Sequence, residues 1–216
     1  MALDYIRDPD RAHRETLARI RARVDMGGLP PGIAEVALRL IQASGDTGLL
    51  PDLAWSADLV PACQAALARG AAILTDSDLV AHGLIRARLP AANPVHCYLN
   101  HVTARRIGRS QNITRAAAAV ELWPPHLAGA LVVIGASPSA LFRLLELLDE
   151  GAPRPAAILA FPVGFVDATE AKQELARDTR RLPYLLLHGT RGGGSLATAA
   201  LDALTGLGPA PRSEGG

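Results

Sequence analysis

The sequence predicts an α/β protein with a mostly parallel, doubly wound sheet and helices on both of its faces. Short apolar runs alternate with helical stretches along most of the chain, and parallel neighbouring strands need such crossover connections. Hydrophobic residues make up 49% of the chain and charged residues 20%, which supplies a core and argues against disorder. From a length of 216 residues we expect a single domain over residues 1–207.

Two helices are expected before the sheet begins. Asp8 can cap the first helix, which Gly27-Gly28 would end. The second helix follows Pro30-Pro31, and apolar residues recur at helical spacing until Gly45. Gln42 is therefore expected in the last turn of the second helix.

From residue 56 onward, strands and helices alternate. The expected strands are residues 72–75, 95–99, 130–134, 156–161 and 184–187. The expected helices are residues 56–70, a stretch from about residue 77, and residues 112–122, 139–148, 167–178 and 195–204. Ligands of such sheets bind beyond the carboxyl ends of the strands, so the loops after the strands are the candidate sites. Residues 208–216 lack a large apolar side chain, and we expect a disordered tail there.

Composition and charge exclude several classes of function. The chain has 22 basic and 21 acidic residues, so no overall field attracts nucleic acid or an anionic membrane. The N-terminus is charged where an export signal is apolar, and prolines and glycines interrupt the uncharged run 122–142, so we expect neither a signal nor a membrane span. Cys63 and Cys97 are too few for a disulfide framework, which favours the cytoplasm.

The richest loop is residues 188–195, His-Gly-Thr-Arg-Gly-Gly-Gly-Ser, between an expected strand and helix. Free N–H groups at the helix start can hold an anion, although the lysine of a P-loop is missing. The alternative is a glycine turn that lets helix and strand pack closely, and Arg191 favours carboxylate binding. Together with Arg86 and Arg88, Arg105-Arg106 and Arg115, this loop indicates a ligand with several carboxylates, the alternative being a solvated charged face.

Two other kinds of site are weaker in the sequence. Ser137 and Ser139 follow a strand, but they do not meet the G-x-S-x-G pattern of a hydrolase, and a helix cap explains them better. No two of the six histidines are four residues apart, and carboxylates or cysteines at metal-site spacing are missing. We therefore expect no metal site.

Seven separated segments form a pattern that covers the chain up to about residue 207. They are Asp-Tyr-Ile-Arg-Asp at 4–8, Asp-Ser-Asp-Leu-Val-Ala-His-Gly at 76–83, Arg-Ala-Arg-Leu-Pro at 86–90, Asn-Ile-Thr-Arg-Ala-Ala at 112–117, Leu-Ala-Gly at 127–129, Pro-Val-Gly-Phe-Val at 162–166 and Gly-Gly-Gly-Ser at 192–195. In their order and spacing these segments resemble the precorrin-8X methylmutase family of corrin biosynthesis.

The resemblance implies an isomerase that moves a methyl group from C-11 to C-12 of a corrin precursor, giving hydrogenobyrinate or its cobalt counterpart. It implies a homodimer with the site near the subunit interface and no external cofactor. Substrate contacts are then expected from Thr16, Gly83, Arg86, Arg88, Arg115, Arg191, Gly193 and Ser195.

Gln42 stands where the family pattern has the catalytic histidine, near the end of the second helix. A glutamine amide donates hydrogen bonds but is no acid near neutral pH, unlike an imidazole with an unperturbed pKa of about 6.5. Three interpretations stay open: a slow isomerase, a paralogue that binds or carries a corrinoid without turnover, or an engineered variant that traps its ligand. As a further alternative, His82 supplies the acid.

Overall fold

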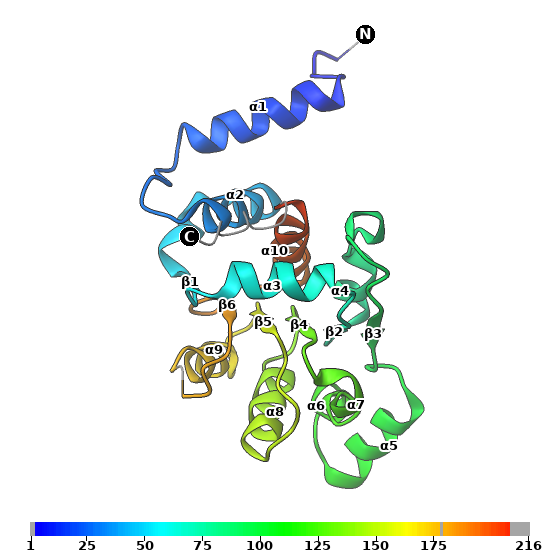
Figure 1. The fold of residues 1–216 in the computed structure, drawn as a ribbon. Coiled ribbons are helices and arrows are strands. Elements are labelled where there is room, and N and C mark those ends of the chain that lie inside the picture. Colours follow the sequence, from blue (N-terminus) through cyan, green and yellow to red (C-terminus); the bar gives the residue numbers. More distant parts are fainter. Residues whose placement is uncertain (1–2, 178, 208–216) are drawn as a thin grey trace, which may run out of the picture.

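A computed structural model describes residues 3–177 and 179–207 of the chain, so the expected tail at 208–216 lies outside the described residues. A sheet of six strands forms the centre, in the order β1-β6-β5-β4-β2-β3 (Figure 1). The strands are β1 (Leu53–Trp55), β2 (Ile73–Thr75), β3 (Val95–Cys97), β4 (Leu131–Ile134), β5 (Ala157–Ala160) and β6 (Tyr184–Leu187). All pairings are parallel except that of β1 with β6, which confirms the predicted α/β class.

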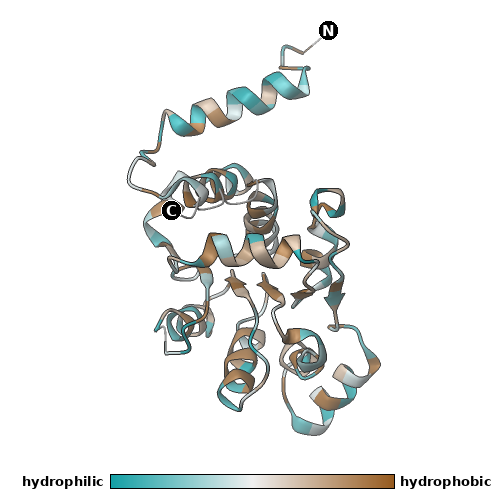
Figure 2. Cartoon of the chain, viewed as in Figure 1, coloured by the Kyte–Doolittle hydropathy of each residue, from teal (hydrophilic) through white to brown (hydrophobic). Residues whose placement is uncertain are grey.

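The central strands are buried on both faces, and this explains why they are apolar apart from Thr75 of β2 (Figure 2). Along β4, Leu131 and Val133 belong to one hydrophobic cluster, while Val132 and Ile134 belong to another. Successive side chains of a strand point to opposite faces, so the two clusters lie on opposite sides of the sheet. The sheet is therefore the middle of three layers.

Helices cover each face of the sheet. On one side, α2 (Pro31–Ser44), α3 (Leu59–Ala68) and α10 (Gly194–Gly206) share a hydrophobic cluster with the strands. On the other side, α6 (Arg115–Val120), α8 (Pro138–Asp149) and α9 (Ala168–Ala176) do the same (Figure 1). This is the predicted doubly wound arrangement.

The first helix, α1 (Pro9–Arg21), lies outside these layers, against α2 (Figure 1). As predicted, Asp8 caps it, because its side chain accepts hydrogen bonds from the N–H groups of Asp10 and Arg11. Within α1 the buried residue is Ile20. The helix is thus held to the body mainly near its C-terminal end.

Several short elements differ from the predictions. The sequence pattern did not predict β1, α5 (Val102–Gln111), α7 (Pro124–Leu127) and the 3₁₀ turns η1 (Thr47–Asp52) and η2 (Arg86–Arg88). The helix expected at 112–122 begins at Arg115, because the side chain of Thr114 caps it. The helix expected from about residue 77 is the short α4 (Asp78–Gly83). Within the described residues, no helix is both long enough and apolar enough to cross a membrane.

Candidate active site

The carboxyl ends of the five parallel strands meet at one edge of the sheet, and the loops there carry Asp76, Asn100, Ser137 and residues 188–193. Strands β2 and β4 are neighbours in the sheet, but the connection from β2 leads to β3 on one side of this pair and the connection from β4 leads to β5 on the other side. The topological switch point therefore lies between β2 and β4. Ligands of open α/β sheets bind at such a point. The groups around it therefore define the candidate site.

Asp76, directly after β2, fills the switch point itself. Its carboxylate accepts hydrogen bonds from the backbone N–H groups of Gly135, Ala136 and Ser137, at 2.9, 2.8 and 2.7 Å. Burial raises the pKa of this carboxyl, and the three N–H donors oppose that rise. The chain's own carboxylate thus occupies the N–H groups of the turn after β4, so a ligand has to lie above this turn.

A row of hydrogen-bonded side chains borders the ends of β2 and β3. The amide of Asn100 donates to the carboxylate of Asp78, and the guanidinium of Arg115 donates to the amide oxygen of Asn100 at 3.3 Å. Arg115 is exposed, and among the described residues it has no carboxylate partner. Its charge is therefore available to an anionic ligand.

The two serines considered for a hydrolase lie in the same region. Ser137 Oγ lies 2.9 Å from Ser139 Oγ, which lies 2.6 Å from Thr114 Oγ1. Within the described part of the chain, no histidine or carboxylate side chain bonds to either serine hydroxyl. Ser137 holds the N-cap position of α8 but makes no capping bond with its side chain. This arrangement lacks the base that a serine nucleophile needs.

The loop of residues 188–193 lies between β6 and α10, as predicted. A Cβ added at Gly192 would lie 2.3 Å from the carbonyl oxygen of Phe161, so only glycine fits there. The N–H group of Gly193 donates to the same carbonyl oxygen at 2.8 Å. Ser195, in the first turn of α10, is exposed. Close packing thus explains Gly192, while Ser195 is open to a ligand.

Two cations fix this loop from within the protein. Arg191 donates to the carboxylates of Asp46 and Asp52, the first at 2.6 Å, and to the carbonyl oxygen of Gly48 at 2.9 Å. The pKa of Asp46 is lowered by the hydrogen bond from the Gly48 N–H and then by Arg191. The sequence analysis assigned Arg191 to a ligand, but in this structure it joins the loop to η1.

The second cation is Lys172 of α9, the single lysine of the chain. Its side chain is fully buried, and Nζ donates to the carbonyl oxygen of Arg191 at 2.7 Å. Burial lowers the pKa of Lys172 to about 8, against a smaller opposing effect of Asp52. This role was not predicted from the sequence, although a single lysine in an arginine-rich chain is a visible signal.

Gln42 lies in the last turn of α2, where the sequence placed it, and it is half-buried. Its amide nitrogen lies 3.3 Å from Nδ1 of His13 on α1, and its amide oxygen accepts from Arg39 at 3.2 Å. Arg39 also lies 3.2 Å from Nε2 of His13. Thr16 is exposed one turn further along α1, and its hydroxyl donates to the carbonyl oxygen of Ala12. His13 was not predicted from the sequence as a member of this group.

Gly83, Arg86 and Arg88 lie along α10 rather than in the loops at the strand ends. A Cβ at Gly83 would lie 2.8 Å from Cγ2 of Thr198, so this glycine lets α4 pack closely on α10. Arg86 and Arg88 form η2 and are exposed. The backbone N–H of the residue before η2 donates to Asp202 of α10 at 3.4 Å.

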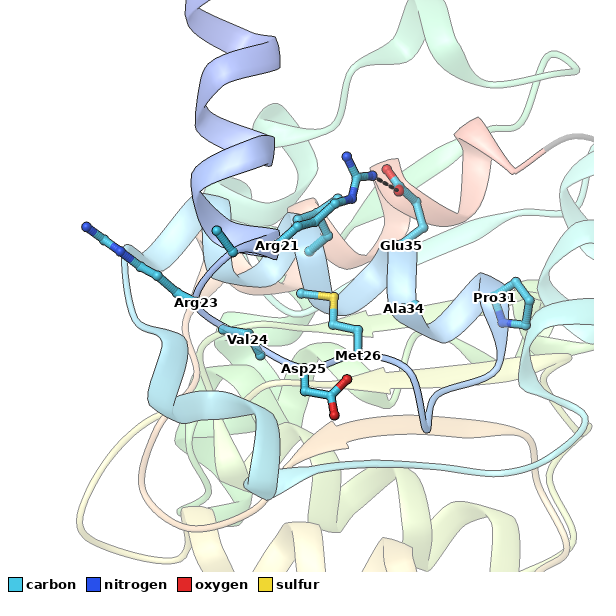
Figure 3. Close-up of a pocket in the computed structure, with 10 residues that line it drawn as sticks. Arg21, Arg23, Val24, Asp25, Met26, Pro31, Ala34 and Glu35 are labelled. Carbon is cyan, nitrogen blue, oxygen red and sulfur yellow. Dashed lines mark ion pairs between the residues drawn. The ribbon is translucent and has the colours of Figure 1, made fainter.

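Three surface depressions show how these groups are distributed. One of about 670 Å³ lies at the connection between α1 and α2, where Arg21 pairs with Glu35 over Met26 (Figure 3). One of about 480 Å³ is lined by Pro31, Glu35, Arg39, Arg88, Asp202, Ala203, Gly206 and Leu207. One of about 700 Å³ is lined by Arg105, Gly108, Arg109, Asn112, Ile113 and Arg115. Arg39, which contacts Gln42, thus lines the same depression as Arg88. Arg115 lines a different depression, together with Arg105 and Arg109 of α5.

The structure thus joins some of the predicted site residues and leaves others apart. Arg191 and Asp46 tie the end of α2, with Gln42, to the loop that carries Gly193. Arg115 belongs to the separate row beside Asp78. Among the described residues, no three histidine, cysteine, aspartate or glutamate side chains gather in a group that could hold a metal ion.

An α/β sheet with Arg115 and polar side chains such as Asn100 beside the carboxyl ends of its strands suits an α/β enzyme that binds an anionic substrate. Comparison with known proteins gives the family. The family model described as precorrin-8X methylmutase matches residues 12–207. The chain belongs to the precorrin-8X methylmutase family.

Individual relatives agree with the family match. The chain is 48% identical to a precorrin-8X methylmutase of Pseudomonas aeruginosa over 202 residues, which cover 94% of this chain and 97% of the relative. It is 43% identical to one from Sinorhizobium, over 93% of this chain and 96% of the relative. A solved precorrin-8x methyl mutase from Thermus thermophilus is similar with a TM-score of 0.82 and 34% identity, covering 91% of this chain and 94% of that chain.

Proposed function

We propose that this protein is an isomerase that moves a methyl group from C-11 to C-12 of precorrin-8X or its cobalt counterpart. The observation that carries the proposal is the family match over residues 12–207, together with relatives named precorrin-8X methylmutase at 48% and 43% identity. A relative from Methanothermobacter thermautotrophicus, 32% identical over 85% of this chain, is named cobalt-precorrin-8 methylmutase. These names favour an isomerase over a corrinoid carrier.

The charges of the site suit such a substrate. A corrin precursor carries several acetate and propionate side chains around its ring, and arginine binds carboxylates through two parallel hydrogen bonds. Arg115, Arg86 and Arg88 are exposed and can meet these carboxylates from different sides of the site. We assign Thr16, Gly193 and Ser195 to the substrate surface, and we assign Arg191 to holding the loop that carries the last two.

Proton donation is the chemical step for which the Gln42 position matters. Protonation of the ring C nitrogen would help the methyl group to leave C-11, and general acid help of this kind is worth about 10²–10⁴-fold. The amide of Gln42 cannot supply that proton near neutral pH. An isomerase with this sequence therefore needs a proton donor other than residue 42.

The experiment that tests the function compares the chain with its Gln42→His variant. Each purified protein is mixed with precorrin-8X, and the absorption spectrum is followed. We expect conversion by the unaltered chain. Tight binding without conversion, rescued by the Gln42→His change, would instead identify a corrinoid carrier. Failure of both proteins to bind would reject the corrinoid function altogether.

We also propose that the protein is a cytoplasmic homodimer that needs no external cofactor. Exposed apolar side chains support an assembly, because Phe165, Val166 and Leu79 are 95%, 75% and 67% exposed. Two free cysteines, Cys63 and Cys97, support a reducing compartment. Fractionation of cells that produce the protein at its natural level would test the location.

A further inference from the structure

We propose that α5 and the start of α6 form a capture surface, which draws a corrin precursor toward the site by its carboxylates. The exposed side chains of Arg105, Arg106, Arg109 and Arg115 define this arginine surface. Arg115 belongs to the proposed substrate contacts, whereas the other three extend beyond them along α5. The inference rests on the proposed function, because it takes a corrinoid with several carboxylates as the ligand.

Positive charge collects on this surface without carboxylates to balance it. Residues 79–120 contain no aspartate, glutamate or lysine, while arginines recur through them. Among the described residues, no carboxylate forms an ion pair with any arginine of the surface. The whole chain has a formal net charge of +1, so the positive field is a local property of this face.

The arginines line two adjoining hollows. Arg105, Arg109 and Arg115 are among the residues that line the depression of about 700 Å³. A further depression, of about 580 Å³, is lined by Val102, Arg105, Arg106, Arg109 and Ser110. Arg105 and Arg109 line both, and their spacing of four residues places them on one face of α5. A ligand in these hollows therefore meets several guanidinium groups at once.

The turn between α5 and α6 fixes the arginine of α6 beside those of α5. Asn112 ends α5 in the left-handed conformation, with φ at 54°, and its N–H donates to the carbonyl oxygen of Gly108. A Cβ at Gly108 would lie 3.3 Å from the carbonyl oxygen of Ile113, so the turn packs closely on the helix. The side chain of Thr114 then caps α6. The surface is thus held in place by the backbone.

The arginine surface leads from the periphery of the molecule to the carboxyl ends of β2 and β3. Figure 1 shows α5 at the periphery, following β3. At the inner end of the surface, the guanidinium of Arg115 donates to Asn100 at 3.3 Å. The amide of Asn100 donates in turn to Asp78, at the start of α4. The surface is therefore continuous with the row of polar side chains beside the switch point.

A small ligand with several carboxylates suits this surface best. Arginine pairs with a carboxylate through two parallel hydrogen bonds, and a corrin precursor carries acetate and propionate groups around its ring. None of the described residues that line the two hollows is aromatic, so a nucleic acid would find no side chain on which its bases could stack. Positive charge beside a site speeds the association of an anionic ligand. We assign Arg105, Arg106 and Arg109 to association and not to the chemical step.

The test measures how fast hydrogenobyrinate, the proposed product, binds to the full chain in a stopped-flow absorption experiment. This probe has the carboxylates of the substrate but is not isomerised, so association is separated from turnover. Arg105→Gln with Arg109→Gln removes two charges from the surface, and Arg105→Lys with Arg109→Lys keeps them. The matched control is Arg177→Gln with Arg181→Gln, because both arginines are exposed and lie beyond the arginine surface, near the end of α9. Melting temperatures check that each variant is folded.

We expect the surface glutamine variant to bind at least about threefold more slowly than the unaltered chain at about 0.01 M salt. The lysine variant and the control should bind at the unaltered rate. At about 1 M salt the Debye length is about 3 Å, so all four proteins should bind at similar rates.

Three results would overturn the inference and leave the isomerase intact. They are equal rates for the surface glutamine variant and its control at low salt, slowing that persists at high salt, and a lysine variant as slow as the glutamine variant. An unaltered chain that binds no hydrogenobyrinate would also overturn it. If that chain also failed to bind or convert precorrin-8X, the proposed function would be overturned as well.

Discussion

Arg115 and Arg191 carry the same charge but have different partners, and this difference predicts what each does. Arg191 is engaged by two carboxylates of its own chain, whereas Arg115 donates to the neutral amide of Asn100. We predict that Arg115→Ala raises the dissociation constant of precorrin-8X roughly 10- to 100-fold, because a charge-assisted hydrogen bond contributes about 1.5–3 kcal/mol. Equilibrium titration measures this change.

The matched control for this prediction is Arg177→Ala. Arg177 follows α9 and pairs with Glu174 there, so the same loss of charge should leave the affinity unchanged. Equal affinities for Arg115→Ala and Arg177→Ala would remove Arg115 from the substrate surface.

Lys172 predicts an unusual dependence of stability on pH. Burial lowers its pKa in the folded protein to about 8, from 10.5 in the unfolded chain. Between these two values the unfolded chain binds more protons, so the free energy of unfolding should rise with pH, by up to about 3 kcal/mol from this residue. Urea unfolding at pH values across this window should show the rise in the unaltered chain and its loss in Lys172→Met. Identical slopes for the two proteins would contradict the assignment.

The residues of the site were only partly predictable from the sequence. The place of Gln42 in the last turn of a helix followed from an apolar pattern and the glycine cap at Gly45, whereas its assignment to the site came from the resemblance to the family. His13 was not found, since its contact with Gln42 joins residues 29 positions apart in the chain and depends on how α1 packs against α2. Helical periodicity predicts a helix but does not say which neighbour its polar face meets.

At the scale of elements, the loop between β6 and α10 is fixed by close backbone contact. We predict that Gly192→Ala lowers the free energy of unfolding by about 1–3 kcal/mol or more, because its Cβ would overlap the carbonyl oxygen of Phe161. Gly28→Ala is the control, since a Cβ there meets nothing within 4 Å. Chemical unfolding of both variants gives the comparison, and equal stabilities would show that the loop adjusts freely.

The elements that the sequence predicted are those with a strong apolar signal. Strands β2, β4, β5 and β6 are buried on both faces, so their runs of apolar residues stand out. The edge strand β1 was missed because Ala54 and Trp55 are only partly buried and because it follows a proline, Pro51. Helix α5 was missed because it buries Ala104 alone and carries arginines instead of an apolar face.

At the scale of the whole molecule, the predicted fold class is confirmed by five parallel strands whose carboxyl ends meet at one edge of the sheet. The proposed homodimer remains a prediction. We expect sedimentation to give twice the 22.6 kDa of the chain. Replacement of the exposed Phe165 by serine should weaken the dimer, because it removes an apolar side chain that is 95% exposed in the single chain. A monomer at all concentrations would move the site away from a subunit interface.

We propose that this chain, with glutamine at position 42, isomerises a corrin precursor. The most direct measurement follows precorrin-8X labelled with carbon-13 in the methyl group on C-11, incubated with the unaltered protein and observed by nuclear magnetic resonance. We predict that the labelled methyl appears on C-12 at a rate that depends on protein concentration. A labelled methyl that stays on C-11 while the substrate is bound would contradict it and would leave a protein that holds corrinoids without turning them over.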